Sequence, residues 1–198
     1  RLDRETTRTT INETVTQVAS VFAVVLGAKI FVAFVGFTDI ADRVEPEDVT
    51  QVLSEYMSTM TDIIQAHGGT LNEFAGDGLM ALFGAPQGMP PEDQVCQSVA
   101  AALAMQDCMP RLNEGWRKLG LGAELKIRIG INTGMASVGS YGSSGRMTYT
   151  AVGLQTNIAA RLEAQAEPGE ILISEASWEL AKGRVTAESR GEISVKGV

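Results

Sequence analysis

The sequence predicts an α+β domain in which a mixed, mainly antiparallel sheet is covered by helices and preceded by a short N-terminal helix. Apolar stretches of helical length alternate with single β-branched runs and with paired short runs joined by glycine. Such alternation is typical of one sheet with helices packed on it. The 198 residues are 44% hydrophobic, which suits the core of a single domain.

The composition argues against several classes of function. Sixteen basic and twenty-four acidic residues give a net charge of −8, so we expect no nucleic-acid partner. Cys96 and Cys108 lie too far apart along one predicted helix to form a disulfide and suit a reduced, cytoplasmic protein. The apolar run 21–35 is interrupted by Gly27 and Lys29 and is shorter than the roughly 20 residues of a membrane span. Because the chain starts without Met, we expect an upstream sensor or membrane domain.

Residues 1–27 are predicted to form an amphipathic, coiled-coil-like helix, and residues 28–198 the domain that follows it. Five apolar residues repeat at spacings of four and three, as in a heptad seam: Ile11, Val15, Val18, Phe22 and Val25. This stripe fits a dimerising helix and a helix that packs on its own domain equally well.

The first elements of the domain surround a predicted hairpin. A run of β-branched and aromatic residues over 30–35 predicts a buried central strand. Pro46, followed by two acids, predicts a helix that Gly68-Gly69 ends. Two apolar runs then flank Gly76-Asp77-Gly78 and predict a β-hairpin over 70–84. A carboxylate held rigidly at the tip suits a Mg²⁺ ligand, although aspartate often serves only to make the turn.

The second half of the chain continues the alternation. Pro91 opens a second helix, which should bend or end near Pro110 because proline removes a helical hydrogen bond. Apolar runs bounded by glycine, proline and serine predict the rest: strands over 125–131, 149–152 and 171–173, a loop or loose hairpin over 134–145, helices over 154–166 and 175–181, and a terminal strand pair over 185–188 and 193–196.

Three motifs follow one another along this frame: Phe34-Val35-Gly36-Phe37-Thr38, the hairpin over 70–84 with Glu73 in its first strand and Asp77 at its turn, and Asn157-Ile158-Ala159-Ala160-Arg161-Leu162-Glu163. From about residue 29 to 198 the chain therefore resembles a class III nucleotidyl cyclase catalytic domain of bacterial type. The resemblance implies a ferredoxin-like core and a homodimer with two symmetric sites at its interface. It also implies conversion of GTP or ATP to a 3′,5′-cyclic nucleotide and pyrophosphate, with two Mg²⁺ or Mn²⁺ ions per site, in a cytoplasmic signalling protein.

The resemblance also assigns the metal and phosphate groups. Asp77 and the backbone carbonyl of Phe34 would bind metal, and these residues would contact phosphates: Phe34, Val35, Gly36, Phe37, Thr38, Arg128 and Lys196. The family's other metal-binding aspartate falls at Ala33, whose methyl group cannot bind a cation. Either the protein is a naturally degenerate cyclase, or a substitution inactivates an otherwise complete site. The intact remainder favours the second interpretation.

The remaining assignments concern the ribose and the base. Asn157 and Arg161 are spaced i, i+4 and share one helix face; the resemblance implies that they orient the ribose and stabilise the transition state. The resemblance also implies that Glu73 and Thr150 occupy the two base-reading positions. A carboxylate can accept hydrogen bonds from the N1–H and N2–H₂ groups of guanine, so Glu73 slightly favours GTP over ATP. The Thr150 hydroxyl can donate or accept and does not discriminate.

Three other functions are consistent with parts of this pattern. Ala33 supports a nucleotide-binding pseudo-cyclase that acts as a dimerisation or regulatory module. A diguanylate cyclase would carry a Gly-Gly-Asp/Glu-Glu-Phe turn, and this chain has Ala75-Gly76-Asp77-Gly78-Leu79 instead. A purely structural domain would leave four residues unexplained together: Glu73, Arg128, Asn157 and Arg161.

Overall fold

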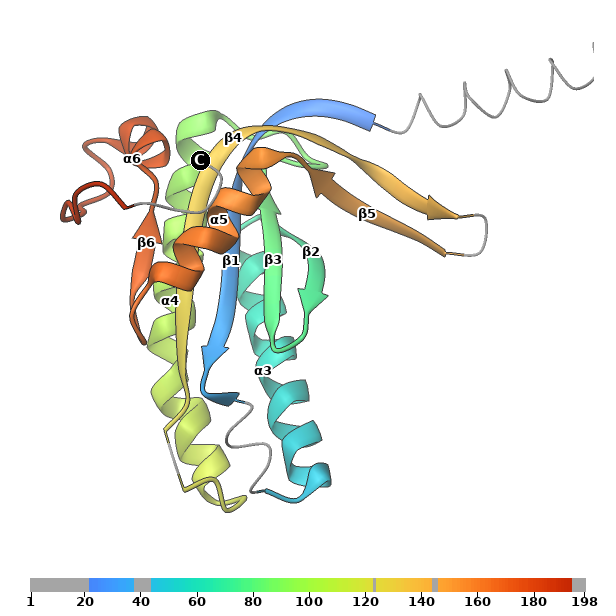
Figure 1. Cartoon of the computed structure of the whole chain (residues 1–198), viewed down its shortest axis with the longest axis vertical. Helices are drawn as coiled ribbons and strands as arrows, with labels where there is room; N and C mark the ends of the chain where they lie inside the picture. Colours follow the sequence, from blue (N-terminus) through green and yellow to red (C-terminus); the bar gives the residue numbers. More distant parts are fainter. Residues whose placement is uncertain (1–21, 38–43, 123, 144–145, 194–198) are drawn as a thin grey trace, which may run out of the picture.

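The computed structural model describes residues 22–37, 44–122, 124–143 and 146–193 (Figure 1). One six-stranded sheet has the order β2-β3-β1-β4-β5, and β6 pairs with β4. All pairs are antiparallel except β4 with β6. The mixed sheet and its helices confirm the predicted α+β class.

In chain order the elements are β1 (Phe22–Val35), α3 (Pro46–Ala66), β2 (Thr70–Ala75), β3 (Gly78–Phe83), α4 (Pro91–Arg117), β4 (Lys126–Ser143), β5 (Arg146–Val152), α5 (Leu154–Gln165), β6 (Ile171–Ile173) and α6 (Glu175–Ala181).

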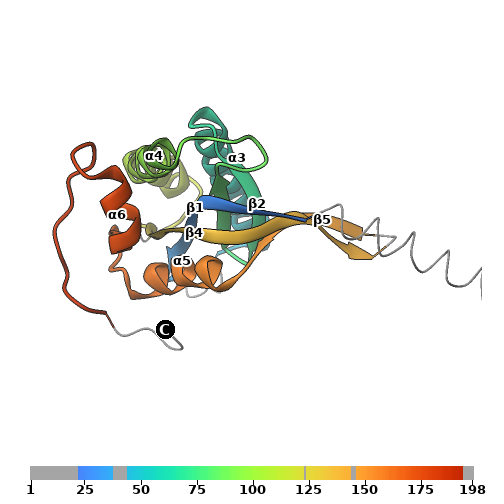
Figure 2. The same ribbon diagram turned by 90° about the horizontal axis from the view of Figure 1, so that it is seen from above.

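The main core lies between the sheet and the helices α3 and α4. Alternate residues of the two central strands are fully or almost fully buried there: Ile30, Val32 and Phe34 of β1, and Ile127, Ile129 and Ile131 of β4. Because side chains alternate across a strand, Ala33 and Arg128 face the opposite side of the sheet. Figure 2 shows α5 on that side and α3 with α4 on the other. The helices were predicted to cover mainly one face of the sheet. In the structure α5 also covers part of the other face.

The sheet also curls, so that its two ends approach each other. β4 and β5 form a long hairpin that bends over the upper end of the central strands (Figure 1). Asn72 of β2 hydrogen-bonds to Thr150 and Ala151 of β5, although β2 and β5 stand at opposite ends of the strand order. This contact brings the two predicted base-reading strands together.

The long strands differ from the prediction. Residues 22–27, assigned to the N-terminal helix, are strand, because β1 pairs with β4 along its whole length from Phe22 opposite Gly139 to Val35 opposite Lys126. Residues 134–143 continue β4 and pair with β1 or with β5. This glycine-rich stretch, predicted as a loop or loose hairpin, is therefore one arm of a hairpin whose other arm is β5. Residues 1–21 lie outside the described part.

Two further predictions concern the ends of elements. The second helix was predicted to bend or end near Pro110; it does not end there, because its later turns are anchored by the buried residues Asn113 and Trp116. Asn113 hydrogen-bonds to the backbone of Leu125, and Trp116 Nε1 donates to Glu55 Oε2 at 2.9 Å. Residues 185–188 form no strand, apart from an isolated bridge between Lys182 and Val185. Val185 packs against the main core, and the three residues after it are exposed. Residue 193 is not strand either, and 194–196 lie outside the described range.

The predictions about the cysteines and about a membrane span can also be compared with the structure. Cys96 and Cys108 are free thiols on α4, as expected. Within the described ranges, the helices are all too short or too polar to cross a membrane.

Lys29 is an unusual buried lysine on β1. It is 1% exposed, and Nζ donates to the carbonyl oxygens of Gly27 at 3.0 Å and Gly134 at 2.6 Å, tying β1 to β4. Burial lowers the pKa of this amine to about 8, because the charged form loses its hydration.

Lys29 should make stability depend on pH. Between the native pKa of about 8 and the model-peptide value of 10.5, the unfolded chain binds the proton and the native chain does not, so stability rises with pH. From about pH 7 to pH 10 we expect the free energy of unfolding to rise by about 2 kcal/mol relative to Lys29→Met. Urea unfolding of both chains at the two pH values measures this difference. If the unfolding free energies of the two chains differ by the same amount at pH 7 and at pH 10, the burial argument is contradicted.

Candidate active site

The β2–β3 hairpin presents Asp77 near the end of β1. Val32 lies opposite Leu79 in the β1–β3 ladder, and a Cβ on Gly78 would come within 3.0 Å of the Val32 carbonyl oxygen. The turn itself needs glycine at position 76, where φ is +65°. In the next ladder, Ala33 lies opposite Arg128. Position 33, Asp77 and Arg128 therefore share one end of the sheet.

The turn after β1 offers its backbone rather than its side chains. The Phe34 ring is 4% exposed, stacks on Phe37 with centroids 5.2 Å apart and packs against Tyr56 at 3.9 Å. Gly36 has φ of +72°, and among the described residues nothing lies within 4 Å of where its Cβ would be. The described residues thus leave space beside a backbone that could approach phosphates closely. Thr38 lies outside the described residues.

Arg128 is held by a carboxylate that the sequence reasoning left without a role. Its Nε donates to Glu163 Oε1 at 2.5 Å, and Glu163 is 5% exposed. Burial raises the pKa of Glu163, and the charge of Asp77 raises it further, while Arg128 opposes both effects. The ion pair fixes the guanidinium at one nitrogen and leaves its other donors for a ligand. Glu163 is the last residue of the third motif, and that position is the one feature of the sequence that could have indicated its role.

Helix α5 packs very closely on β4. A Cβ on Gly130 would lie 2.1 Å from the carbonyl oxygen of Ala159, so only glycine permits this approach. Asn132 Nδ2 also donates to Gln155 O at 2.8 Å and Oε1 at 2.9 Å, fixing the first turn of the helix. On this helix Asn157 is exposed and Arg161 is half-buried.

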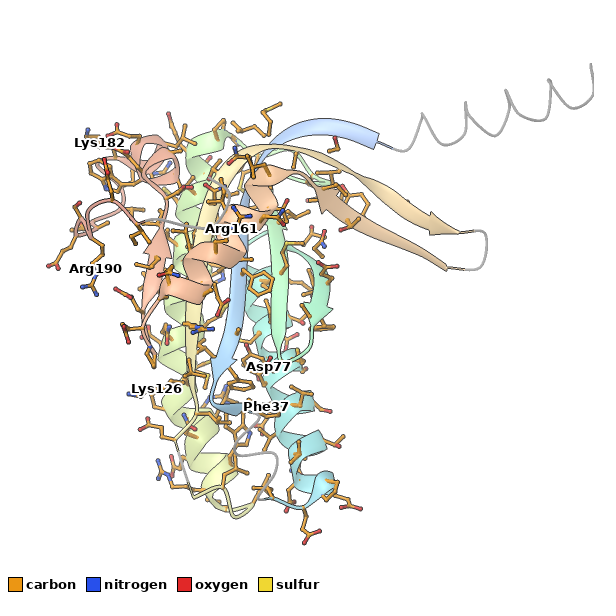
Figure 3. All side chains as sticks on the ribbon, viewed as in Figure 1. Phe37, Asp77, Lys126, Arg161, Lys182 and Arg190 are labelled. Atoms are coloured by element: carbon orange, nitrogen blue, oxygen red, sulfur yellow. The ribbon has the colours of Figure 1, made fainter. Side chains whose placement is uncertain are left out.

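Arg161 is separated from Asp77 within one chain. Figure 3 shows Asp77 and Phe37 at the lower end of the central strands and Arg161 well above them on α5. Within the described part of the chain, Arg161 Nη1 is buried and has no hydrogen-bond partner. A buried donor without a partner is unusual, because leaving it unpaired costs free energy.

The predicted residues thus fall into two parts. We call Ala33, Asp77, Arg128 and the 34–37 backbone the phosphate part. We call Glu73, Thr150, Asn157 and Arg161 the base part; Glu73 is exposed on β2, Thr150 is partly exposed on β5, and α5 follows β5 directly. Lys196 lies outside the described residues.

The described residues supply ligands for only one of the two predicted metal ions. The described residues hold no group of three or more His, Cys, Asp or Glu side chains arranged around a cation. Asp77 and the Phe34 carbonyl supply hard oxygen donors, which together with nucleotide phosphates suit one Mg²⁺. The methyl group of Ala33 supplies none, so these residues do not fit a two-ion site.

Comparison with known proteins shows the family to which this domain belongs. The family model of the adenylate and guanylate cyclase catalytic domain matches residues 27–198. The chain belongs to this family.

The relatives of this cyclase domain include enzymes named for either base. Adenylate cyclase 1 of Rhizobium meliloti (strain 1021) is 38% identical over 127 residues, which are 64% of this chain and 19% of that protein. The adenylyl cyclase CyaB from P. aeruginosa is 36% identical, with a TM-score of 0.87 over 89% of this chain and 90% of that chain. The guanylyl cyclase Cya2 is also 36% identical, with a TM-score of 0.85 over 90% and 89%. The choice of base must therefore be argued from this chain's own residues.

Proposed function

We propose that this cyclase domain acts as a homodimer that converts a purine nucleoside triphosphate, with GTP preferred to ATP, into the 3′,5′-cyclic nucleotide and pyrophosphate. We further propose that Ala33 leaves the present chain with very weak turnover. The observation that carries the proposal is the β1–β4 register, in which Ala33 stands opposite Arg128 at the end of the sheet that carries the Asp77 hairpin. One missing carboxylate in an otherwise assembled phosphate part fits an impaired cyclase.

The reaction joins the ribose 3′-oxygen to the α-phosphorus and breaks the bond from that phosphorus to the pyrophosphate oxygen. The 3′-hydroxyl loses its proton, and the leaving pyrophosphate gains negative charge. In our proposal Arg128 and the 34–37 backbone bind the terminal phosphates, Asn157 orients the ribose, and Arg161 stabilises charge on the α-phosphate. A divalent ion held by Asp77 and the Phe34 carbonyl would neutralise phosphate charge.

The dimer is supported by what one chain leaves incomplete. Asp77 and Arg161, which we propose act on the same nucleotide, lie apart within the chain. Four large apolar side chains on β2, β4, β5 and the start of α5 are 50–54% exposed: Phe74, Met135, Val152 and Leu154. A second copy, related by a two-fold axis, would cover these side chains and join the phosphate part of one subunit to the base part of the other.

The preference for GTP rests on Glu73. Its exposed carboxylate accepts hydrogen bonds and cannot donate them, which matches the N1–H and N2–H₂ edge of guanine. Both nucleotides are cytoplasmic, so we place the domain in the cytoplasm. Since the chain spans 19% of the R. meliloti relative, we also propose that it works within a longer signalling protein that has an upstream sensor.

A second candidate is a nucleotide-binding pseudo-cyclase that works through dimerisation or regulation. Ala33 favours it, because a site that lacks one metal ligand can still bind nucleotide through Arg128 and Asp77. The two candidates differ in whether an added carboxylate at position 33 is sufficient for turnover.

The test is product formation from GTP and from ATP with Mn²⁺, by this chain and by Ala33→Asp. We expect the 3′,5′-cyclic nucleotide and pyrophosphate in equal amounts from the variant, faster from GTP, and only traces from the present chain. Binding of nucleotide without product from either chain would favour the pseudo-cyclase. Failure of both chains to bind or cyclise would overturn the proposal.

A further inference from the structure

Asn72 is a buried amide between the two base-reading residues, and no role has been assigned to it so far. It precedes Glu73 on β2, is 7% exposed, and sits where the β2–β3 register shifts between Leu71 and Glu73. Such a bulge re-aims a side chain away from the regular ladder. The amide here reaches across to β5, where Asn72 Oδ1 accepts from Ala151 N at 3.1 Å and Asn72 Nδ2 donates to Thr150 Oγ1 at 3.2 Å.

The orientation of this amide is determined by the backbone. The Ala151 N–H group can only donate, so the Asn72 atom facing it must be the oxygen. The atom facing Thr150 is then the NH₂ group, which can only donate. The Thr150 hydroxyl oxygen therefore accepts from Asn72, and its single proton is left to point elsewhere.

With its proton free, Thr150 can donate to a base beside Glu73, which can only accept. Guanine presents the O6 acceptor next to the N1–H and N2–H₂ donors, which complements a hydroxyl donor followed by a carboxylate. Adenine in the same placement presents its N6–H₂ donor to the hydroxyl, whose remaining lone pair can accept it, and its N1 acceptor to the Glu73 carboxylate. The mismatch with adenine therefore lies at Glu73, whereas guanine O6 needs the proton of Thr150.

We propose that Asn72 is a positioning residue that keeps the Thr150 hydroxyl proton free to donate to guanine O6, and thereby supports the binding of guanine. The inference rests on the proposed cyclase function and adds the polarity of the second base-reading group.

Asn72→Asp tests this polarity with almost no change in shape. The new carboxylate still accepts from the Ala151 N–H group but cannot donate to Thr150. The hydroxyl must then turn its proton to the carboxylate and offer a lone pair to the base, which suits the N6–H₂ group of adenine. In the Ala33→Asp chain, we expect the ratio of kcat/KM for GTP to that for ATP to fall about tenfold.

Thr150→Val supplies the control, because it removes the hydroxyl and keeps the shape. With valine at position 150, Asn72→Asp should change the GTP/ATP ratio by less than about twofold. A variant that merely loosened the fold would slow both nucleotides and leave the ratio unchanged. The dissociation constants of GTP and ATP, measured by calorimetry on the present chain and its Asn72→Asp variant, should show the same shift without requiring turnover.

The outcomes separate this inference from the function on which it rests. Binding or turnover with an unchanged GTP/ATP ratio in Asn72→Asp overturns the role of Asn72 and leaves the cyclase proposal intact. An equal change in the ratio with and without the Thr150 hydroxyl also overturns it. Failure of every chain to bind or cyclise either nucleotide overturns the proposed function, and the inference with it.

Discussion

Ala33→Asp is expected to raise the rate of cyclic-nucleotide formation by about a hundredfold or more. Position 33 lies opposite Arg128 in the ladder and shares its end of the sheet with Asp77. A second carboxylate there adds the hard ligand that a second divalent ion needs, and such an ion stabilises the attacking and leaving oxygens. Ala33 is only partly buried, so the new charge would not enter the main core. Initial rates with GTP and Mn²⁺ measure the effect.

Ala33→Asn is the matched control for this prediction. Its amide has the size of the aspartate side chain but no charge, so it should leave the rate within about tenfold of the present chain. Urea unfolding of the three chains checks that they are equally folded. A rate for Ala33→Asn that equals the rate for Ala33→Asp would show that the carboxylate is not acting as a metal ligand.

Arg161→Ala in the Ala33→Asp chain should lower kcat by about a hundredfold to a thousandfold and change KM by only a few-fold. The guanidinium is proposed to stabilise charge that develops on the α-phosphate, so its loss affects the transition state more than the bound substrate. Steady-state kinetics with GTP separate the two parameters. Arg161→Lys keeps a charge but loses the planar fork, and should recover about tenfold of that loss.

The fold provides an internal check on this interpretation. Arg161 Nη1 is buried without a hydrogen-bond partner in the described part of the chain, so its removal should not destabilise an isolated subunit. A large loss of unfolding free energy in Arg161→Ala would mean that the side chain is structural. A fall in kcat/KM caused by KM alone would contradict transition-state stabilisation.

Local patterns were enough to predict much of this fold. The helix at 46–67, the hairpin around Asp77 and the helix that carries Asn157 and Arg161 all follow from proline, glycine and apolar spacing, and the structure confirms them. Their signals lie within a few residues of one another. The resemblance, carried by three such local motifs, correctly indicated the family.

The features that could not be predicted depend on distant partners. The glycine-rich residues 134–143 resemble a loop until β1 and β5 pair with them, and the buried Trp116 keeps α4 helical beyond Pro110. Glu163 lies 35 residues from Arg128, and Asn72 lies 78 residues from Thr150. These contacts depend on the curl of the sheet and on the close packing of α5, which no local pattern reveals.

Complementation between two defective chains tests the central claim, a cyclase site shared by two subunits, most directly. The present chain lacks the carboxylate at position 33 but keeps Arg161, whereas the double variant Ala33→Asp/Arg161→Ala has the opposite defect. Each should be nearly inactive alone. In a mixed dimer, the phosphate part of the double variant meets the base part of the present chain and completes one site.

The measurement is the rate of cGMP formation after equimolar mixing, compared with the rates of the separate chains. If half of the dimers are mixed and each holds one complete site, the mixture should reach about a quarter of the specific activity of Ala33→Asp. Activity that merely equals the sum of the two separate chains, under conditions where subunits exchange, would contradict the shared site.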